Sequence, residues 1–273
     1  MSEAASTMTV PPDCVRAIRE ARAVVVLTGA GVSAESGIPT FRDALSGLWA
    51  KYDPMRLATP EAFAADPQRV TQWYDQRRAA CRERQPNAGH VALAQMQQRV
   101  AASGGGMTLI TQNVDRLHQR AGTHDVIELH GSLAVWRCVD CGERREETGP
   151  MFSAYPPRCD RCGGLRRPDV VWFGEFLDAA VMASAHEAVK HCDLFLSVGT
   201  SAVVEPAASL VHLARAGGAK TVEVNPEATP ISGVVDWSLR GASGRILPAL
   251  VAALAGPGAP GPVAPSDGDL QKR

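Results

Sequence analysis

Five short apolar segments recur along the chain, and each ends at a polar or glycine-containing turn. They occupy residues 23–27, 107–110, 126–129, 194–198 and 221–224. Apolar runs of this length are typical of parallel strands that are buried on both faces of a sheet. Helical patterns lie between several of them, as at 179–191 and 207–216. The alternation predicts an α/β fold with a doubly wound, mostly parallel, Rossmann-like sheet.

The turns that follow the predicted strands carry polar candidate residues. They begin at Thr28, Thr111, His130, Gly199 and Asn225. Ligands of an open parallel sheet bind outside the carboxyl ends of its strands. We therefore expect these turns to converge on one ligand-binding crevice.

Two insertions interrupt the alternation. Residues 43–105 have mainly helical patterns, and residues 136–167 contain four cysteines. We expect both to fold together as a smaller second domain, made of a helical insertion and a zinc ribbon. The Rossmann-like domain then comprises 13–42, 106–135 and 168–254. Residues 1–12 and 256–273 have little apolar side chain to bury and are expected to be flexible termini.

The four cysteines form two Cys-x-x-Cys pairs, Cys138/Cys141 and Cys159/Cys162. This spacing lets both thiolates of a pair reach one ion from a tight turn, and it predicts a structural zinc site with no open coordination position. Gly142, Gly163 and Gly164 suit the turns, because glycine tolerates positive φ. Two disulfides or an iron–sulfur centre are the alternative interpretations.

The formal net charge of −1 gives no general electrostatic attraction to nucleic acid or to an anionic membrane. No apolar run approaches membrane-spanning length, and no basic segment followed by an apolar stretch begins the sequence. Seven cysteines, an odd number, fit a reducing compartment. We expect a cytoplasmic protein that binds neither nucleic acid nor membranes.

The first strand leads into Gly29-Ala30-Gly31-Val32-Ser33-Ala34, which fits the dinucleotide pattern G-x-G-x-x-G/A. Glycines there permit a tight turn and a close approach of the backbone to a pyrophosphate at a helix N-terminus. The acidic residue that usually ends a second strand about 20 positions later is absent. The segment predicts an NAD-type ligand without the usual dehydrogenase fingerprint.

Several motifs, in order, resemble those of the sirtuins, the NAD-dependent protein-lysine deacylases. They are the run 29–42 (GAGVSAESGIPTFR), 111–115 (TQNVD) with Leu117-His118, 129–132 (LHGS), the four cysteines, 170–175 (VVWFGE), 199–201 (GTS) and 224–226 (VNP). The resemblance extends from about residue 15 to 254.

The resemblance implies a reaction in which the acyl oxygen of a modified lysine attacks the nicotinamide-bearing ribose carbon of NAD. His130 would be the general base that helps a ribose hydroxyl attack the resulting imidate. An imidazole can take a proton near neutral pH, although a lone histidine is more often structural. The implied products are free lysine, nicotinamide and O-acyl-ADP-ribose.

The resemblance also implies which residues bind NAD, with Asn113 and Asp115 sharing the catalytic centre with His130. The alternative is a purely structural role for residues 112–115, as a strand-to-helix turn capped by Asn or Asp. The implied cofactor-binding residues are Gly29, Ala30, Gly31, Ser33, Ala34, Phe41, Arg42, Gln112, Asn113, Asp115, Gly199, Thr200, Ser201, Asn225, Pro226, Glu227 and Ser243.

Two segments resemble the edges that hold an extended substrate peptide in this family by strand addition. They are 171–176, with Val171, Phe173, Gly174 and Glu175, and 203–206. The expected partners are therefore acyl-lysine proteins or peptides.

A helix that starts at Asp66-Pro67 would place Tyr74 and Arg77 on a mostly apolar stripe. A cation on such a face needs a partner, which is either an internal carboxylate such as Asp53 or a ligand carboxylate. A snorkelling arginine is a further alternative. Tyr74-x-x-Arg77 with Ala58 is similar to the sirtuin branch that removes succinyl, malonyl and glutaryl groups.

Four functions remain open at this stage. The first is removal of acidic acyl groups, together with acetyl, from protein lysines. The second is plain NAD-dependent lysine deacetylation, and the third is mono-ADP-ribosyl transfer. The fourth is a non-catalytic NAD sensor, against which His130, Asn113 and Asp115 argue.

Overall fold

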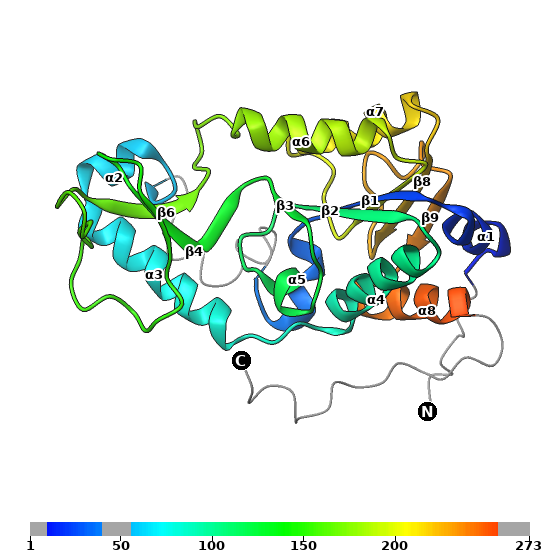
Figure 1. Ribbon diagram of the computed structural model, residues 1–273, viewed down its shortest axis with the longest axis horizontal. Coiled ribbons are helices and arrows are strands. Elements are labelled where there is room, and N and C mark those ends of the chain that lie inside the picture. The colour runs from blue at the N-terminus through cyan, green and yellow to red at the C-terminus, as the bar shows by residue number, and fades with distance from the viewer. Residues whose placement is uncertain (1–9, 40–55, 256–273) are drawn as a thin grey trace.

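A six-stranded parallel sheet forms the larger part of the molecule in this computed structural model, which describes residues 10–39 and 56–255 (Figure 1). Its order is β3-β2-β1-β7-β8-β9. The strands are β1 (Ala23–Thr28), β2 (Gly106–Thr111), β3 (Val126–Glu128), β7 (Leu194–Val198), β8 (Lys220–Asn225) and β9 (Trp237–Arg240). Phe41, Arg42 and Asp53 lie outside the described residues.

The strand order reverses between β1 and β7, which pair in parallel from Val24↔Leu194 to Thr28↔Val198. From β1 the chain proceeds outward through β2 and β3, and it later returns to β7 and proceeds through β8 and β9. Such a switch point leaves a crevice at the carboxyl ends of the two central strands. The five predicted strands and the doubly wound fold are confirmed. The edge strand β9 was not predicted, because its four residues are only partly apolar.

Helices cover both faces of the sheet (Figure 1). One face packs on α1 (Pro12–Glu20), α4 (Ala88–Ala102) and α8 (Ser243–Ala255). The other packs on α6 (Ala179–Lys190) and α7 (Leu210–Ala216), the latter preceded by the 3₁₀ turn Ala207–Ser209. The helices predicted at 179–191 and 207–216 are therefore present.

Two boundaries differ from the sequence-based expectation. Helix α4 falls inside the predicted insertion 43–105, yet Leu93 and Met96 are fully buried in the core beneath the sheet. A continuous apolar face of α4 meets α8, so this helix packs with the larger domain. Val10, expected in a flexible terminus, packs against the same core.

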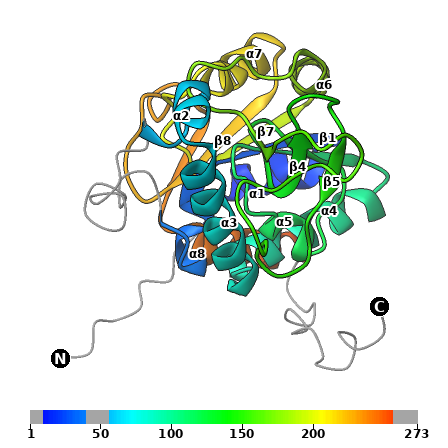
Figure 2. The ribbon, with the colours of Figure 1, turned by 90° about the vertical axis from the view of Figure 1, so that its left-hand side faces the viewer.

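The smaller domain joins segments that are distant in sequence (Figures 1 and 2). It contains α2 (Pro60–Ala65), α3 (Pro67–Glu83) and an antiparallel sheet in the order β5-β4-β6. The strands of this sheet, here called the ribbon, are β4 (Gly131–Cys138), β5 (Arg144–Glu146) and β6 (Arg166–Val170). Their shared core contains Leu57, Ala58, Val70, Trp73, Tyr74, Leu133, Trp136, Val170 and Trp172. The helical insertion and the ribbon therefore fold together, as expected, although the ribbon begins at Gly131.

Helix α3 begins where the sequence predicted. The Asp66 carboxylate accepts a hydrogen bond from the Arg69 amide at 3.0 Å, and Pro67 occupies the first turn. This cap satisfies one of the free amides of the first turn. Val70 and Tyr74 are buried on the predicted stripe.

A neighbouring side of α3 buries an ion pair that the sequence pattern did not reveal. Asp75 is 0 % exposed and Arg78 is 2 % exposed, with Nη2 2.6 Å from Oδ1. The remaining Arg78 donors reach carbonyl groups of residues 147–150 at 2.7–2.9 Å. The second Asp75 oxygen accepts from the Phe152 amide and the Tyr155 hydroxyl. The pair therefore ties α3 to the loop after β5.

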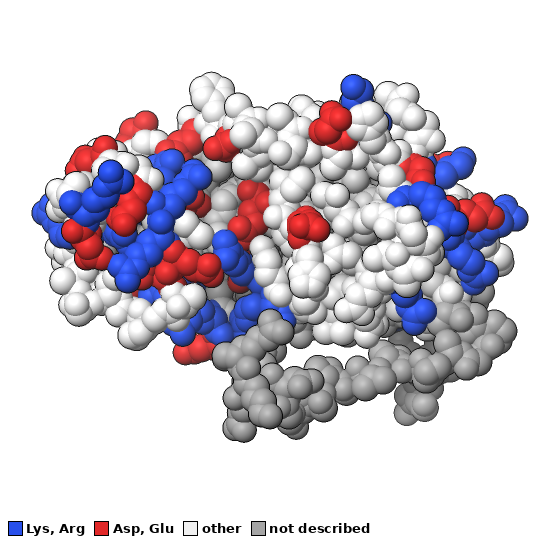
Figure 3. Space-filling view, in the orientation of Figure 1, with Lys and Arg blue, Asp and Glu red and all other residues white. Residues whose placement is uncertain are grey.

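Charged side chains of both signs alternate over the smaller domain, at the left of Figure 3. On the ribbon they form pairs such as Arg144 with Asp169 at 3.0 Å. Exposed pairs of this kind contribute little, about 0–1 kcal/mol each. Removing one partner of a buried pair costs more, because it leaves an uncompensated charge away from water.

Within the described part of the chain, no helix is long and apolar enough to cross a membrane.

Replacing Arg78 by Met should lower the free energy of unfolding by about 3–5 kcal/mol, because it leaves the Asp75 carboxylate buried without its cation. Urea unfolding followed by circular dichroism measures this change. The control is Arg82→Met, one turn along α3. Arg82 is exposed and donates to the Gly149 carbonyl, so its replacement should change stability by only about 0.5 kcal/mol. Similar losses for both variants would contradict a special role of the buried pair.

Candidate functional site

The loops that follow the central strands meet at the switch point. The Gly29 amide donates to the Val198 carbonyl at 3.1 Å, and the Gly31 amide donates to the Gly199 carbonyl at 2.8 Å. A Cβ atom on Gly31 would lie 2.7 Å from that carbonyl oxygen. The glycines are therefore required first for the contact between the two loops.

The segment after β1 forms two short 3₁₀ turns, Ala30–Val32 and Ala34–Ser36, instead of a long helix. Gly37 ends the second turn with φ of 75°. This geometry differs from the helix N-terminus that the dinucleotide pattern implies. It buries the Ser33 side chain, which is 1 % exposed, and leaves Ala34 at the surface.

Ser33 connects two of the expected catalytic side chains. Asn113 Nδ2 donates to the Gly29 carbonyl at 3.0 Å and to Ser33 Oγ at 3.1 Å. Ser33 Oγ donates in turn to Asp115 Oδ2 at 2.7 Å, and Asp115 Oδ1 accepts from the Leu117 amide at the start of α5 (Leu117–Arg120). Burial raises the pKa of Asp115, and these hydrogen bonds oppose the rise.

His130 lies in the turn between β3 and β4. Its Nδ1 is 3.0 Å from the Gln112 carbonyl oxygen. A carbonyl only accepts, so Nδ1 carries the proton and Nε2 has a free lone pair. Burial lowers the pKa of His130, and the Gln112 hydrogen bond opposes this effect in part. The imidazole is therefore neutral at neutral pH and can accept a proton.

Gly131 fixes the direction in which the chain leaves His130. Its φ is 73°, and a Cβ atom there would overlap the Asp169 carbonyl. The His130 carbonyl accepts from the Val171 amide at 3.0 Å. This hydrogen bond joins the histidine to the predicted peptide edge.

Residues expected on the adenosine side gather at the ends of β7 and β8 and at the start of α8. Asn225 Nδ2 donates to the Thr200 carbonyl at 3.3 Å, and Gln112 Nε2 lies 3.4 Å from Thr200 Oγ1. The Glu35 carboxylate accepts from the Gly244 amide at 2.7 Å and lies 3.4 Å from Ser243 Oγ, which brings Ser243 next to the loop after β1. Ser201 is half-buried, and Pro226 and Glu227 are exposed after β8.

The sequence analysis missed His90 and gave no role to His118, and both lie beneath this network. His118 Nε2 is 3.0 Å from Thr28 Oγ1, and His90 Nε2 is 3.4 Å from Ser33 Oγ. The two rings are 4.8 Å apart. Burial lowers the pKa of His90 to about 4, and burial with the neighbouring His90 lowers that of His118 to about 3. The capping box Asn87-x-x-His90 can be read from the sequence, but its contact with Ser33 cannot.

The predicted peptide edge packs against the helical insertion. The Phe173 amide donates to the Ala58 carbonyl at 2.9 Å. Gly174 has φ of 84°, and the Glu175 carboxylate accepts from Arg167 at 2.6 and 2.9 Å. Glu175 therefore stabilises this turn through hydrogen bonds within the protein. Phe173 itself stays 45 % exposed.

The second predicted peptide edge, residues 203–206, has exposed apolar side chains. Val203 is 63 % exposed and Val204 is 47 % exposed. Phe176, at the end of the first edge, is 97 % exposed. Exposed apolar side chains at these two segments suit contact with a peptide.

The stripe on α3 places Tyr74 and Arg77 together. The Arg77 guanidinium carbon is 4.7 Å from the Trp73 ring centre and 5.6 Å from that of Tyr74. Burial raises the pKa of Tyr74 to about 12, so its hydroxyl stays protonated and can donate. Cys81, one turn further, lies near enough to Asp115 for that charge to raise the pKa of the thiol, although burial contributes more. The stripe therefore extends toward the Ser33–Asn113–Asp115 network.

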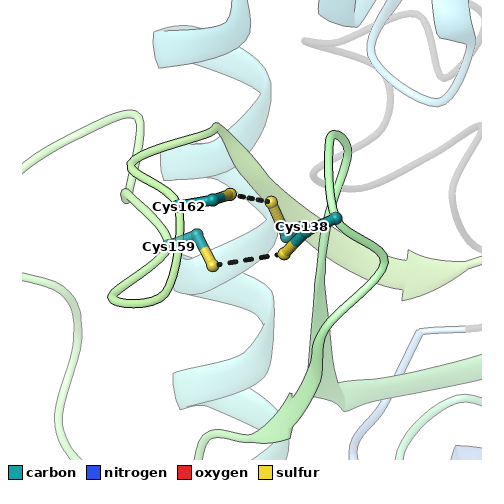
Figure 4. Close-up of side chains that lie close together, drawn as sticks. Cys138, Cys159 and Cys162 are labelled. Atoms are coloured by element: carbon teal, nitrogen blue, oxygen red, sulfur yellow. Dashed lines mark hydrogen bonds between the residues drawn. The ribbon is translucent and has the colours of Figure 1, made fainter.

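The sulfur atoms of Cys138, Cys141, Cys159 and Cys162, here called the cysteine cluster, all lie within 4.8 Å of one another. Two loops present them face to face (Figure 4). The Cys138–Cys162 and Cys141–Cys159 sulfur distances are 3.4 and 3.8 Å, too long for an S–S bond, which excludes the alternative interpretation of two disulfides. Tetrahedral coordination at a Zn–S distance of about 2.3 Å requires sulfur separations of about 3.8 Å.

The surroundings of the cysteine cluster also fit a structural zinc. Amides of Asp140 and Cys141 donate to the Cys138 sulfur, as expected for a thiolate ligand. Gly142 and Gly163 have φ of 71° and 76°, as predicted for the turns. A side chain on Gly164 would overlap Asp140, which explains the second glycine after Cys162.

Solved structures share this fold over nearly the whole chain. A Sir2 homologue–NAD complex is 46% identical, with a TM-score of 0.83, and the match covers 90% of this chain and 94% of that one. A Sir2 variant with a deacetylated peptide and 3′-O-acetyl ADP-ribose is 32% identical, with a TM-score of 0.75 over 86% of this chain and 94% of that one.

Relatives in other organisms are similar over most of their length. A protein from Thermus thermophilus named NAD-dependent protein deacylase is 52% identical over 82% of this chain and 87% of its own. One of the same name from Methylococcus capsulatus is 49% identical over 89% and 96%, respectively. The model of the Sir2 family matches residues 29–206. This chain belongs to the Sir2 family, the sirtuins.

Proposed function

We propose that this protein removes succinyl, malonyl and glutaryl groups, and also acetyl groups, from protein lysines at the expense of NAD. The NAD-dependent deacylase activity follows from relatives of that name at about half identity, and use of NAD from Sir2 structures that hold NAD or ADP-ribose. The preference for acidic acyl groups rests on one observation, the Tyr74–Arg77 pair beside the cofactor residues.

His130 is the general base in this proposal. Its protonated Nδ1 is held by the Gln112 carbonyl, so Nε2 is the atom that accepts a proton from a ribose hydroxyl. The carbonyl fixes both the tautomer and the ring orientation. Because the pKa of His130 is lowered, the base is present in its active form throughout the neutral range.

Asn113 and Asp115 position the nicotinamide ribose and carboxamide. Both are hydrogen-bonded to Ser33, which is itself buried, so their orientation is set before NAD binds. The floor formed by His90 and His118 is uncharged at neutral pH, because burial lowers both pKa values. Because both histidines are neutral, the Asp115 carboxylate is the local charge that can stabilise the positive charge developing on the ribose.

Arg77 binds the terminal carboxylate of the acyl group, and Tyr74 donates a hydrogen bond to it. A guanidinium and a protonated phenol are both donors, and a carboxylate can accept from both. Ala58 leaves room for a longer acyl chain beside the 171–175 segment, to which it is hydrogen-bonded. The runner-up function, plain deacetylation, would use the same base without any need for Arg77.

The substrates of this reaction are acylated proteins or peptides that bind along 171–176 and 203–206. A solved Sir2 structure with a deacetylated peptide supports this class of partner. We propose the cytoplasm as the place of reaction, on the odd number of cysteines.

The cysteine cluster contributes to folding and not to the reaction. Four thiolates fill a tetrahedral zinc site, so no position remains for a reactive water. When bound, zinc would crosslink the two loops of the ribbon. Its binding free energy then becomes part of the folding free energy.

His130→Ala should lower kcat by about 10²- to 10⁴-fold and leave NAD binding nearly unchanged, because it removes proton transfer only. Nicotinamide release and calorimetric NAD titration measure the two quantities. His124→Ala is the matched control, since His124 is exposed and distant from the reacting groups.

In the unchanged protein, kcat/KM should begin to fall only below pH 6.5, because burial lowers the pKa of His130 below that value. A midpoint well above pH 6.5 would contradict this base.

Arg77→Met should reduce the rate on succinyl-lysine peptides by roughly 30-fold or more, since stranding a buried charge costs about 2–5 kcal/mol and each 1.4 kcal/mol is tenfold. The rate on an acetyl-lysine peptide of the same sequence should change little. Tyr74→Phe should show the same preference in milder form. Arg69→Met, an exposed arginine on the same helix, is the control. Equal losses on both peptides would mean that Arg77 only supports the helix, and would leave plain deacetylation as the function.

Cys138→Ser should lose zinc and lower the melting temperature, whereas Cys192→Ser should retain one zinc per chain. Cys192 is buried outside the cluster, and its thiol donates to the Val189 carbonyl as a serine hydroxyl could. Metal analysis of the purified variants and thermal unfolding give the answer. A protein that stays folded and active after complete zinc removal would refute the structural role.

A further inference from the structure

The ribbon contains a second buried arginine, Arg166, directly beside the cysteine cluster. It is 2 % exposed and lies opposite Cys138 in the pairing of β4 with β6. A buried guanidinium requires anionic or carbonyl partners, since its charge is costly away from water. The identity of those partners indicates its purpose.

Arg166 donates to two carboxylates. Nη1 donates to Glu147 Oε1 at 2.8 Å and Nη2 donates to Glu143 Oε2 at 2.9 Å. The same Glu143 oxygen lies 3.0 Å from the Cys159 sulfur, so the guanidinium lies next to a ligand of the zinc site. The buried Nε has no hydrogen-bond partner among the described residues. The cation therefore adjoins the cysteine cluster and retains a donor for another acceptor.

Charge balance explains why a cation is needed at this place. Four thiolates around one Zn²⁺ leave a net charge of −2. Glu143 adds another negative charge, because its Oε2 lies 3.0 Å from the Cys159 sulfur. With a thiol, that contact is a hydrogen bond, but with a thiolate it places two anions together. Arg166 is the positive group at this place, since it donates to Glu143 and lies opposite Cys138 in the ladder.

We propose that Arg166 is a positioning residue for the zinc site, whose buried cation is held beside Cys159 by the Glu143 carboxylate and offsets the negative charge of the four-sulfur site. The inference concerns zinc retention and does not depend on the acyl group that the enzyme removes. Partners in the outer shell of a metal site orient its ligands, and their loss typically costs about 10- to 100-fold in metal affinity.

The alternative is that Arg166 merely pairs with Glu143 and Glu147 and so fixes the ribbon. Two neighbouring residues separate these possibilities. Arg145 lies on the same ribbon and approaches the same Glu147 oxygen at 3.8 Å, but it is 56 % exposed and pairs with Asp160. Glu143→Gln removes one carboxylate charge and leaves Arg166 beside the sulfur.

The test is the rate at which zinc leaves the purified zinc-loaded protein into an excess of the chromogenic chelator 4-(2-pyridylazo)resorcinol. Arg166→Met should release zinc about 10-fold faster or more, following the usual effect of outer-shell partners. Arg145→Met should stay within about twofold of the unchanged protein, because exposed pairs contribute little. Glu143→Gln should release zinc no faster than the unchanged protein, since it removes an anion beside a thiolate.

Two results would overturn the proposal. The first is release from Arg166→Met at the same rate as from Arg145→Met. The second is release from Glu143→Gln as fast as from Arg166→Met, which would show that the carboxylate pair is what matters. If Arg166→Met does not fold, Arg166→Lys decides. Lysine keeps the charge but cannot donate to Glu143 and Glu147 together through a planar fork. Release faster than from Arg145→Met is expected, and an equal rate would reject the role of Arg166.

Discussion

The contact between the loops after β1 and β7 is the constraint on which the cofactor site depends. Gly31 donates to the Gly199 carbonyl at 2.8 Å, and neither loop has room for a side chain at this point. The contact closes the switch point of the sheet and turns the segment after β1 inward. Ser33 is buried as a result, and through Ser33 the Asn113 and Asp115 side chains acquire fixed positions. This contact depends on the close approach of two backbones. It therefore tolerates fewer amino-acid substitutions than any single hydrogen bond in the site.

The smaller domain depends on a different principle. Three buried guanidinium groups supplement its apolar core. Arg78 joins α3 to the loop after β5, Arg166 joins β6 to Glu143 beside the cysteine cluster, and Arg167 pairs with Glu175. Each donates to several acceptors, which is the condition under which a buried cation is tolerated. Because arginine presents a planar set of donors, one side chain can hold several segments in register at once.

The sequence predicted the parts of this molecule that follow from local pattern. Apolar runs identified five strands, Asp66-Pro67 identified the start of α3, and Cys-x-x-Cys spacing identified the zinc site. Contacts between distant segments were not predictable in this way. Helix α4 was assigned to the insertion 43–105 because it continues a helical stretch that no predicted strand interrupts, whereas it packs on α8 in the core of the larger domain. His90 and Arg78 were missed for the same reason, since their partners lie far away in the chain. The 3₁₀ turns after β1 could not be predicted, because Gly199 shapes them from outside the segment.

Adjacent residues of α3 connect the two halves of the smaller domain. Successive side chains on a helix point about 100° apart, so Arg77 and Arg78 face different neighbours. Arg78 is bound by carbonyl groups of the ribbon loop, which fixes the rotation of α3 about its own axis. That rotation determines where Arg77 and Tyr74 lie relative to the Ser33–Asn113–Asp115 network. Zinc bound to the cysteine cluster would hold the ribbon together and would therefore also support the positions of Arg77 and Tyr74, without taking part in the chemistry. In the function proposed above, a closed metal site would thus contribute indirectly to the choice of acyl group.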